Sequence, residues 1–584
     1  MIWTVCFIIS ISVIVFAAVM ALMLRNGKYK SGRVLTPFNM MFGGVFISAL
    51  LLLIPVQNSL ISDEVHSPFQ TFLFSLFSTI QIFVIEGETE LISETLKCPQ
   101  EWLAHTYYIL LSIFYVLAPI MSFVFLLSFF RNATAFIKYI NHYFSDVYIF
   151  SELSEKTLAL GRDIKKKHMR ALIVYTGLTD DDDERQSEYL ERAKAIKAIC
   201  FTKDILAINF KNHYKKAAIN FFSIDEDENC NMIQGLKIIE NYRNRENVRL
   251  YVFSTGVESE LLLAKMDHGK MKVRRVNEIR SLVNRNLYDD GGKIFDNALA
   301  AEDGVKDISV VFVGLGGHGS EMLKGFIWYC QMDGYRIKID AFDENPLAAD
   351  KFWGAMPELA NYDITIHPGV DVMTKTFADD IAKLTKTTFA FVALGSDEAN
   401  LRTAVNLRML FERMNIKPLI QAVVRSSYEK KALEGITNYS GEPYDIDFIG
   451  DVESSFTEDV IINSDLESEA LERHLKWGKE EDFWRYEYNY QSSVASAIHM
   501  RARIHCHIQG AEKADDDMTD EERIAIEKLE HRRWNAYMRS EGYIYSGSHD
   551  KSSRNNLGKM HHDLLEYDEM DDDEKRKDSK VGTI

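Results

Sequence analysis

Charge-free apolar stretches are crowded into the first quarter of the chain. Residues 2–24, 34–56 and 106–130 each run for more than 20 positions without an Asp, Glu, Lys or Arg. A helix of this length crosses about 30 Å of hydrocarbon. In lipid the backbone must satisfy its own hydrogen bonds, which an α-helix does. The pattern therefore predicts an α-helical transmembrane region over residues 1–140 with three spanning helices.

The basic residues near these stretches predict how the chain is oriented. Arg25, Lys28, Lys30 and Arg33 lie in the short segment between the first two stretches. By the positive-inside rule this segment is cytoplasmic, so we expect the N-terminus outside and everything after about residue 131 inside. A multi-pass protein of the inner membrane follows. The alternative, a cleaved signal peptide at residues 2–24, lacks a preceding basic region and a small-residue cleavage site.

A fourth uncharged run, residues 68–85, lies in the predicted external loop and is more polar than the others. A segment that enters from outside and turns back over residues 68–88 would give the helix, re-entrant segment, helix plan of a tetrameric cation-channel pore. Its turn would carry the pore candidates Glu86, Gly87 and Glu88, and a ring of Glu86 or Glu88 carboxylates would favour cations. The alternative is an amphipathic helix on the outer leaflet.

Beyond residue 145 the pattern changes to short apolar runs separated by amphipathic stretches of helical length. One series begins at residues 147–150 and a second at residues 308–313. Strands that alternate with helices indicate an α/β doubly wound parallel sheet. We therefore expect two tandem Rossmann-like domains, at residues 146–300 and 306–450.

The second series carries a glycine motif directly after its first strand. Gly314 permits a tight turn, Gly316 allows the backbone to approach a pyrophosphate, and Gly319 allows close helix packing. Asp343 ends the next strand, where a carboxylate can hold ribose hydroxyls. This arrangement predicts a nucleotide or dinucleotide ligand, such as NAD or a nucleotide second messenger.

Two further features bear on nucleotide binding by these domains. Gly395 and Asp397 follow the fourth strand and are expected at the same sheet edge; alternatively, this segment is a plain helix N-cap. In the first domain the opening strand is followed by residues 151–154, Ser-Glu-Leu-Ser, which include no glycine. We expect that copy to be structural.

Composition excludes several classes of function. The formal net charge of −19 argues against a nucleic-acid partner, which needs clustered Lys and Arg. The six cysteines show no CxxC or Cys/His ligand spacing, so no metal is expected. No Ser-His-Asp or Cys-His set can be assigned, so we do not expect an enzyme.

Residues 391–404, FVALGSDEANLRTA, resemble the fourth strand and following helix of RCK or TrkA-N domains. The resemblance covers about residues 146–428. It implies regulatory domains that assemble face to face and transmit ligand-induced hinge movement to the pore helices of potassium channels. The first domain lacks the glycine motif, which separates it from that pattern.

The C-terminal segment, residues 483–579, resembles the RyR domain, a small, mostly α-helical module named for the ryanodine receptor that also occurs in prokaryotic proteins. The matching motifs are LEHRRWN at residues 529–535, Glu-Gly-Tyr at 541–543, KMHHDLLEYDEM at 559–570 and EKRKD at 574–578. Many members of the family have tryptophan where this chain has Tyr543. The resemblance implies a ligand derived from a nucleotide.

The residue types in this segment suit such a ligand. Arginine guanidinium groups bind phosphates bidentately, aromatic rings stack on a base, and histidines add hydrogen bonds. The predicted pocket residues are His531, Arg532, Arg533, Trp534, Arg539, Tyr543 and His561. The alternative is that Trp534 fills the core of the small domain and that the arginines pair with residues 571–574.

Together these features predict a ligand-gated membrane effector. A nucleotide-type small molecule would bind the RCK-like and RyR-like domains and control a cation-channel-like homo-oligomer, a tetramer or dimer, in the lipid bilayer. The RyR resemblance suggests an antiviral setting. Two alternatives stay open: a membrane-anchored enzyme that uses NAD, and a non-conducting nucleotide sensor.

Overall fold

The computed structural model describes residues 1–25, 37–61, 67–84, 90–178, 184–462 and 465–582. The chain forms two compact units, Met1–Tyr143 (unit 1) and Phe144–Ile584 (unit 2). The pore candidates Glu86, Gly87 and Glu88 lie outside the described residues.

Unit 1 is helical. Its elements are α1 (Ile2–Arg25), α2 (Pro37–Leu60), α3 (Pro68–Val84), α4 (Glu90–Glu94), η1 (Thr95–Lys97) and α5 (Glu101–Asn141). Among the described residues, α1, α2 and α5 are long and apolar enough to cross a membrane, as the sequence predicts. The apolar helices could thus insert in a lipid bilayer.

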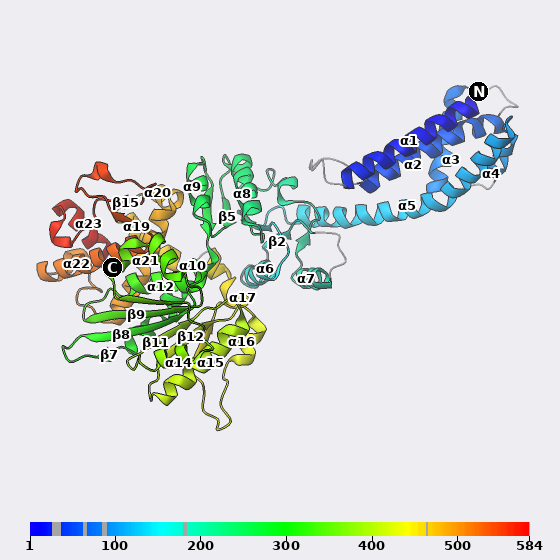
Figure 1. Ribbon diagram of the computed structural model, residues 1–584. Coiled ribbons are helices and arrows are strands. Elements are labelled where there is room, and N and C mark those ends of the chain that lie inside the picture. The colour runs from blue at the N-terminus through cyan, green and yellow to red at the C-terminus, as the bar shows by residue number, and fades with distance from the viewer. Residues whose placement is uncertain (26–36, 62–66, 85–89, 179–183, 463–464, 583–584) are drawn as a thin grey trace. The chain divides into compact units, whose positions relative to one another are not determined.

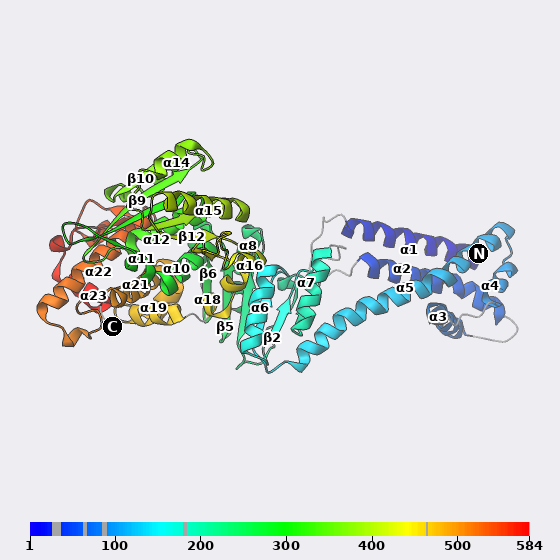
Figure 2. The same cartoon turned by 90° about the horizontal axis from the view of Figure 1, so that it is seen from below.

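Small residues allow α1 and α2 to lie side by side (Figures 1 and 2). A Cβ atom added to Gly44 would lie 2.4 Å from Ala17 Cβ, so the two backbones approach closely there. Ser10 Oγ donates to Ser48 O at 3.2 Å, and Ser48 Oγ donates to Ser10 O at 3.0 Å. These reciprocal bonds satisfy two buried hydroxyls.

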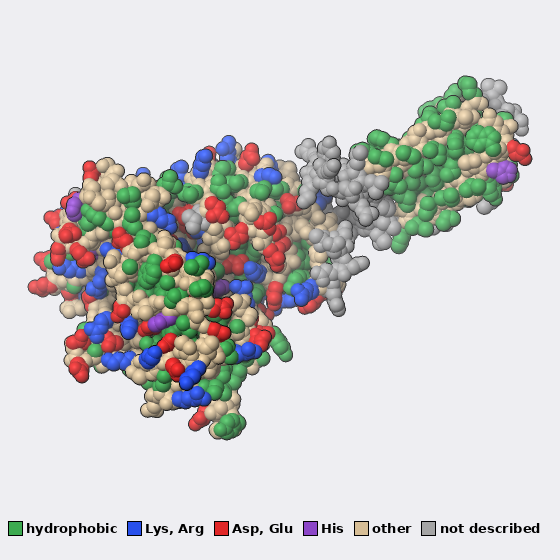
Figure 3. Space-filling model, in the orientation of Figure 1, with side chains coloured by type: hydrophobic (Ala, Val, Ile, Leu, Met, Phe, Trp, Pro, Cys, Tyr) green, Lys and Arg blue, Asp and Glu red, His purple; other side chains and the backbone are tan. Residues whose placement is uncertain are grey.

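The α3 helix buries its polar face and exposes its apolar face. Thr71, Ser75, Ser78 and Thr79 are buried, and Gln57 of α2 donates to Ser78 Oγ at 2.8 Å. Apart from Gln70 in the first turn, the exposed large side chains of α3 are apolar: Phe69, Phe72, Leu73, Phe74, Phe77, Ile80 and Val84. In Figure 3 the visible described face of unit 1 is mostly hydrophobic or neutral, with charged groups at one end. This inside-out polarity suits a helix surrounded by lipid.

Unit 2 begins with a six-stranded parallel sheet in the order β3-β2-β1-β4-β5-β6. Its register pairs Val147 of β1 with Leu172 and Ile219. Its strands are β1 (Val147–Phe150), β2 (Leu172–Tyr175), β3 (Ile199–Cys200), β4 (Ile219–Ser223), β5 (Val248–Phe253) and β6 (Lys272–Val276). Its helices are α6 (Glu155–Lys167), α7 (Glu184–Ala195), η2 (Ile205–Ala207), α8 (Glu228–Tyr242), α9 (Val257–Lys265) and α10 (Glu278–Asp290).

A second sheet repeats this order as β10-β9-β8-β11-β12-β13, with β7 (Leu299–Ala300) antiparallel to β8. Its parallel strands are β8 (Lys306–Val313), β9 (Tyr335–Asp343), β10 (Ile364–Pro368), β11 (Phe389–Val392), β12 (Leu419–Val423) and β13 (Ile446–Ile449). Its helices are α11 (Gly292–Asp296), α12 (Gly317–Tyr329), α13 (Ala348–Ala355), η3 (Pro357–Asn361), α14 (Lys375–Ile381), α15 (Asp397–Arg413), α16 (Ser427–Leu433), α17 (Val452–Ser455) and α18 (Glu458–Ile461). Both sheets confirm the predicted doubly wound α/β class.

The C-terminal region is largely helical. It comprises α19 (Asp465–Leu475), α20 (Glu480–Arg485), α21 (Glu487–His505), η4 (Asp515–Asp517), α22 (Asp520–Ser540), β14 (Ile544–Tyr545), η5 (Lys551–Ser553), β15 (Met560–His561), η6 (Tyr567–Glu569) and α23 (Asp572–Gly582). The strands β14 and β15 form a short parallel pair.

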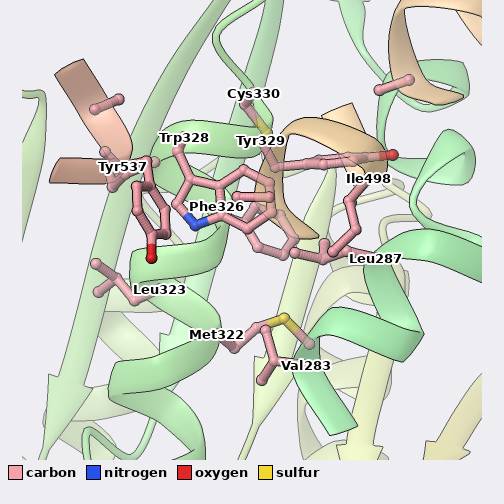
Figure 4. Packing of buried hydrophobic residues seen from close by; sticks show 14 of the residues in the cluster. Val283, Leu287, Met322, Leu323, Phe326, Trp328, Tyr329, Cys330, Ile498 and Tyr537 are labelled. Atoms are coloured by element: carbon pink, nitrogen blue, oxygen red, sulfur yellow. The ribbon is translucent and has the colours of Figure 1, made fainter. Parts of the chain in front are cut away.

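This C-terminal region shares a core with the second sheet. Side chains of β8 alternate between the faces, so that Val310 and Phe312 join one cluster and Val311 joins another. The cluster of Phe312 also contains residues of α10, α12, α21 and α22. Figure 4 shows Trp328 of α12, Tyr537 of α22 and Ile498 of α21 within it. The C-terminal helices therefore pack as a layer on the second Rossmann-like domain.

Candidate functional site

A cavity of about 410 Å³ lies within the C-terminal region. This volume is within the usual range for small-molecule sites. Its walls come from α19, α21, α22, α23 and the segments around β15. The lining residues are Arg473, Trp477, Tyr488, Asn489, Ser492, Ser493, Ser496, Glu530, His531, Arg533, Trp534, Lys551, Arg554, His561, His562, Asp563, Met570, Glu574, Lys577 and Asp578.

The helix α22 carries the central residues of the cavity and is fixed at both ends. At its start, Thr519 and Glu522 form a capping box. At its end, Gly542 has a φ of 82°, and its N–H donates to Arg539 O at 3.0 Å. A glycine tolerates this left-handed conformation and ends the helix. The segment that leads to β14 and β15 begins there.

Three arginines are buried beside the cavity: Arg473, Arg503 and Arg533. Glu530 pairs with Arg503 and accepts from Arg533 Nη2 at 2.5 Å. Burial, followed by the positive charge of Arg503, lowers the pKa of Arg473 to about 10. Positive charge thus gathers beside the cavity, and Glu530 offsets part of it. An anion in the cavity would offset more of it.

Two buried donors on the cavity wall, one guanidinium nitrogen and one hydroxyl, have no hydrogen-bond partner among the described residues. They are Arg533 Nη1 and Ser496 Oγ, and their side chains are 1% and 3% exposed. A buried donor without an acceptor costs about 1–3 kcal/mol. Acceptor oxygens of a bound molecule would remove that cost.

Aromatic rings form one wall of the cavity. The ring of Trp534 is only partly buried and lies edge-on to His561, with centroids 4.9 Å apart. His531 lies nearly parallel to Trp534 at 6.0 Å. The Tyr488 ring also lines the cavity, and the guanidinium of Arg554 lies 5.3 Å from its centroid. These faces suit stacking on a planar base.

His531 is held in place by a hydrogen-bond network. Its Nδ1 lies 3.1 Å from Asp578 Oδ2 of α23, and its Nε2 lies 2.9 Å from Leu565 O. Burial lowers the pKa of His531, but the bond and the charge of Asp578 outweigh it, so the pKa is raised. Burial raises the pKa of Asp578 to about 6. His531 is thus a positioned member of the wall.

Lysines and an exposed arginine add positive charge on the side formed by η5 and α23. Lys551 and Lys577 both bind Glu574, at 2.5 Å and 2.6 Å. Arg554 is exposed, and its Nε donates to Asn556 Oδ1 at 2.9 Å. Arg554 has no acid partner among the described ion pairs. Its guanidinium is therefore available to an anion in the cavity.

Four of the seven predicted pocket residues line this cavity: His531, Arg533, Trp534 and His561. The partly buried Trp534 also packs against the hydrophobic core, while ligand contact by its ring stays a prediction. Burial lowers the pKa of His561 to about 3, with a smaller effect from Arg554.

The other three predicted pocket residues point elsewhere. Arg532 is on the surface and binds Asp333 at 2.7 Å. Arg539 binds Glu358 of η3 at 3.0 Å and thereby ties α22 to the second domain. Tyr543 is buried in the core, with its ring centroid 5.9 Å from that of Tyr488. Among the described ion pairs, the α22 arginines thus use acids other than those at residues 571–574.

The glycine motif forms the turn between β8 and α12 at the point where the strand order of the second sheet reverses. Gly314 has a φ of 90°, and a Cβ on Gly319 would lie 1.8 Å from Gly314 O. No atom lies within 4 Å of a Cβ added to Gly316. The carboxylate of Asp343 accepts from Leu315 N at 2.7 Å and from Asn345 N at 2.8 Å. It therefore braces the loop.

Gly395 and Asp397 lie near the same sheet edge, after β11. Asp397 Oδ2 accepts from Arg425 N at 3.0 Å and from Ser426 N at 2.9 Å, while Ser396 caps α15. No atom lies within 4 Å of a Cβ added to Gly395. Ser396 is thus the N-cap of α15, as the alternative interpretation of this segment expects. Asp397 instead connects α15 to the segment that follows β12.

In the first domain, the turn after β1 has polar side chains in place of glycine. Ser154 caps α6 through a capping box with Thr157. Ser151 Oγ donates to Ile224 O at 3.0 Å. The bond of Ser151 joins the turn to the end of β4, and the structural role of this copy stays a prediction.

Sequence reasoning missed most of the cavity. Arg473, Tyr488, Arg554 and Lys577 come from segments spread over more than 100 residues. The residues of α22 could be predicted because the motif at 529–535 lies within one helix. The residues that face it show no motif spacing, because only the packing of α19, α21 and α23 brings them to the same place.

No family model matches the chain, and no curated protein matches it in sequence. The arguments for function therefore rest on the geometry described above and on the motifs in the sequence.

Proposed function

We propose that this chain is a ligand-gated membrane effector. A nucleotide-type anion binds the cavity between α21, α22 and α23 and biases a cation pathway formed by unit 1 in a homo-oligomer, a dimer or tetramer. The observation that carries the proposal is the buried cluster of Arg473, Arg503 and Arg533 beside the cavity, in which Arg533 Nη1 has no hydrogen-bond partner among the described residues. Ligand binding must differ between the closed and open states for gating to occur.

The chemistry of the cavity favours a phosphate joined to a planar base. Guanidinium groups recognise phosphate oxygens through paired hydrogen bonds, and Arg533 has an unpartnered Nη1 on the wall. Trp534 and Tyr488 supply ring faces for the base. The RyR-like motifs of this segment support the same class of ligand. We do not place the ligand at the glycine loop of the second domain, because the carboxylate of Asp343 already accepts hydrogen bonds from two backbone amides.

A shared ion-pair cluster supports transmission of ligand binding through unit 2. Arg280 of α10 binds Glu321 of α12 at 2.6 Å and Glu541 at the end of α22 at 2.9 Å. All three side chains are at most 22% exposed. The helix that lines the cavity is therefore tied to both Rossmann-like domains. A shift of α22 would strain these bonds or move their partners.

Two features of unit 1 support a role in conduction. The α3 helix turns its polar face inward against the bundle, which is the reverse of a helix lying on the membrane surface. The α5 helix has 41 residues, or about 60 Å at 1.5 Å per residue, twice the hydrocarbon thickness. It ends at Asn141, and β1 begins at Val147, so the connection to unit 2 is short. A short connection transmits movement better than a long flexible linker.

We propose that the ligand is bound and released unchanged. Incubating the full-length protein with NAD+ and analysing the nucleotide by chromatography tests this part of the proposal. Intact NAD+ is expected, whereas its consumption would favour the NAD-using enzyme.

Thermal stabilisation by nucleotides tests the binding site. The full-length protein in detergent is melted with ATP, NAD+ or cyclic di-AMP. At least one of these should raise the melting temperature, because a ligand that binds only the folded state stabilises it. The Arg554→Ala substitution should weaken that ligand about 10- to 100-fold, since a hydrogen bond to a charged group contributes about 1.5–3 kcal/mol.

Matched variants locate the effect. Arg532→Ala removes an arginine of α22 that binds Asp333 outside the cavity, so it should leave the stabilisation unchanged. Gly316→Val fills the open side of the glycine loop and should also leave it unchanged. Loss of the shift in Gly316→Val but not in Arg554→Ala would move the site to the glycine loop. No shift with any of the nucleotides would contradict the proposal.

A further inference from the structure

Three metal-binding groups stand together on the cavity wall at the end of β15. His561, His562 and Asp563 each offer one ligand atom, and these atoms lie within 4.8 Å of one another. All three residues line the cavity. The two imidazole rings are nearly parallel, at 11°, with centroids 4.8 Å apart. The end of β15 and the loop after it therefore present a compact set of two nitrogens and one oxygen.

The hydrogen bonding in this group leaves the imidazole of His562 available to a cation. His562 is 6% exposed, and neither of its ring nitrogens has a hydrogen-bond partner among the described residues. Its Nε2 lies 3.3 Å from Asp563 Oδ1. The Nδ1 of His561 accepts from Asp563 N at 3.1 Å, so a cation at His561 would take this lone pair in place of the backbone N–H. A buried imidazole without any hydrogen bond is costly unless another partner binds it.

We propose that His561, His562 and Asp563 form a site for a divalent transition metal of the Zn²⁺ class, whose open coordination position takes a phosphate oxygen of the ligand. The inference deepens the proposed function and, in its second part, rests on it. It also revises the sequence-based expectation of no metal, which rested on the absence of Cys/His ligand spacing. Two adjacent histidines and the next aspartate give no such spacing.

The donor set decides the class of metal. Two imidazoles and one carboxylate suit Zn²⁺ and its neighbours, whereas Mg²⁺ and Ca²⁺ prefer oxygen ligands throughout. Three protein ligands leave one tetrahedral position open, as in zinc sites that bind a further molecule. With bonds of about 2.0–2.2 Å, the donors must lie roughly 3.4 Å apart, so the loop after β15 closes by about 1 Å on binding.

The location couples the metal to the anion site. The same cavity is lined by Arg533, Arg554 and Lys577. A divalent cation adds positive charge where a phosphate would bind, and a phosphate oxygen would complete its coordination. Nucleotide binding should therefore be tighter with the metal than without it.

Cobalt titration tests the metal site without any nucleotide. The full-length protein in detergent is treated with EDTA, desalted and titrated with Co²⁺, whose visible absorption reports the ligands and their geometry. We expect one tight site per chain. The His562→Gln and Asp563→Asn variants should each weaken it at least about tenfold. His549→Gln, at an exposed histidine of the same region that does not line the cavity, should bind as the unaltered chain does.

Stability separates loss of ligation from loss of folding. His562→Gln breaks no hydrogen bond of the described structure, but it removes the contact with Asp563 and the ring stacking on His561. Its melting temperature in EDTA therefore measures the structural loss alone, and Co²⁺ affinities are compared at a temperature where both proteins are folded. Equal Co²⁺ affinity in the unaltered chain and in His562→Gln would overturn the metal site and leave the His562–Asp563 contact as a simple ion pair.

Nucleotide binding with and without metal distinguishes the two proposals. ATP, NAD+ and cyclic di-AMP are tested by thermal shift in Zn²⁺ and in EDTA. In the unaltered protein, the bridging role predicts that the thermal shift needs about tenfold less nucleotide in Zn²⁺ than in EDTA. In His562→Gln, it predicts that the thermal shift needs the same nucleotide concentration in Zn²⁺ and in EDTA. Equal sensitivity in Zn²⁺ and EDTA would overturn that role while the proposed function stands. Co²⁺ binding that is lost in His562→Gln, without stabilisation by any of these nucleotides, would uphold the metal site and contradict the proposed function.

Discussion

Glu152 illustrates how one side chain takes the place of a glycine in the turn after β1. It is partly buried, and this burial raises its pKa to about 7 despite a hydrogen bond from Ser154; the charges of Asp225 and Glu226 add to the rise. The carboxyl group is therefore partly protonated near neutral pH. Negative charge gathers at this sheet edge, which suits a phosphate poorly and agrees with a structural role for the first domain.

The pH dependence of stability tests this assignment. Between pH 4 and 7 the folded state holds a proton on Glu152 that the unfolded state has released, so stability falls as the pH rises through this window. Glu152→Gln removes that loss. Its melting temperature should match that of the unaltered protein at pH 4 and exceed it at pH 8. The corresponding gain in the free energy of unfolding at pH 8 should be no more than about 3 kcal/mol.

Glu240→Gln, on the exposed surface of α8 in the same domain, provides the control and should shift neither melting curve. Equal melting temperatures of Glu152→Gln and the unaltered protein at pH 8 would show that the carboxyl group is not perturbed by its surroundings.

The turn between β8 and α12 shows why a glycine motif has structural requirements of its own. Gly319 lies so close to the start of the turn that a Cβ would overlap Gly314 O at 1.8 Å, whereas Gly316 has open space. Two glycines of the motif are thus needed for the close approach of helix and strand. The motif therefore predicts the fold here more directly than it predicts a ligand.

Alanine substitutions separate these positions. Gly319→Ala should destabilise unit 2 by more than about 2 kcal/mol, because the backbone must shift to relieve the overlap. Gly316 has a φ of −66°, and an added Cβ would have free space. Gly316→Ala should therefore change the free energy of unfolding by no more than about 1 kcal/mol. Thermal melting of both variants without nucleotide provides the measurement. Similar losses in the two variants would contradict the packing argument.

The strands that could be predicted are those with continuous apolar runs, such as β1, β8 and β11. The sixth strand of each sheet escaped notice for a physical reason. In β6, Arg274 and Arg275 interrupt the apolar pattern, and their charges are accommodated by Glu467 and Glu487. In β13, Asp447 lies in a short edge strand. Tertiary partners that the sequence does not reveal allow these residues to lie in a sheet.

The candidate site was predictable along α22 and at His561 of β15. Successive helical residues are rotated by about 100°, so Arg532 and Arg533 face different surroundings although they are neighbours. The motif could not tell which arginine faces the cavity. His562 was passed over because its role depends on three-dimensional neighbours and on its lack of hydrogen bonds.

The chain as a whole joins an apolar helical unit to a large α/β unit through the short segment after α5. Each unit has its own core. Buried apolar residues of unit 1 such as Leu52 and Leu111 pack together, and the second sheet shares its core with the C-terminal helices. Our account requires that events in one unit alter the other. Gating is therefore the property that tests it, beyond ligand binding alone.

Ligand-dependent cation flux is the most direct test. Full-length protein is reconstituted in liposomes loaded with K⁺, and efflux is recorded after adding ATP, NAD+ or cyclic di-AMP in the presence of Zn²⁺. We predict that a nucleotide that stabilises the protein also triggers efflux, that Arg532→Ala responds equally, and that Arg554→Ala needs at least about tenfold more nucleotide. A nucleotide that binds the cavity tightly yet leaves the liposomes impermeable to K⁺ and Na⁺ would contradict the account.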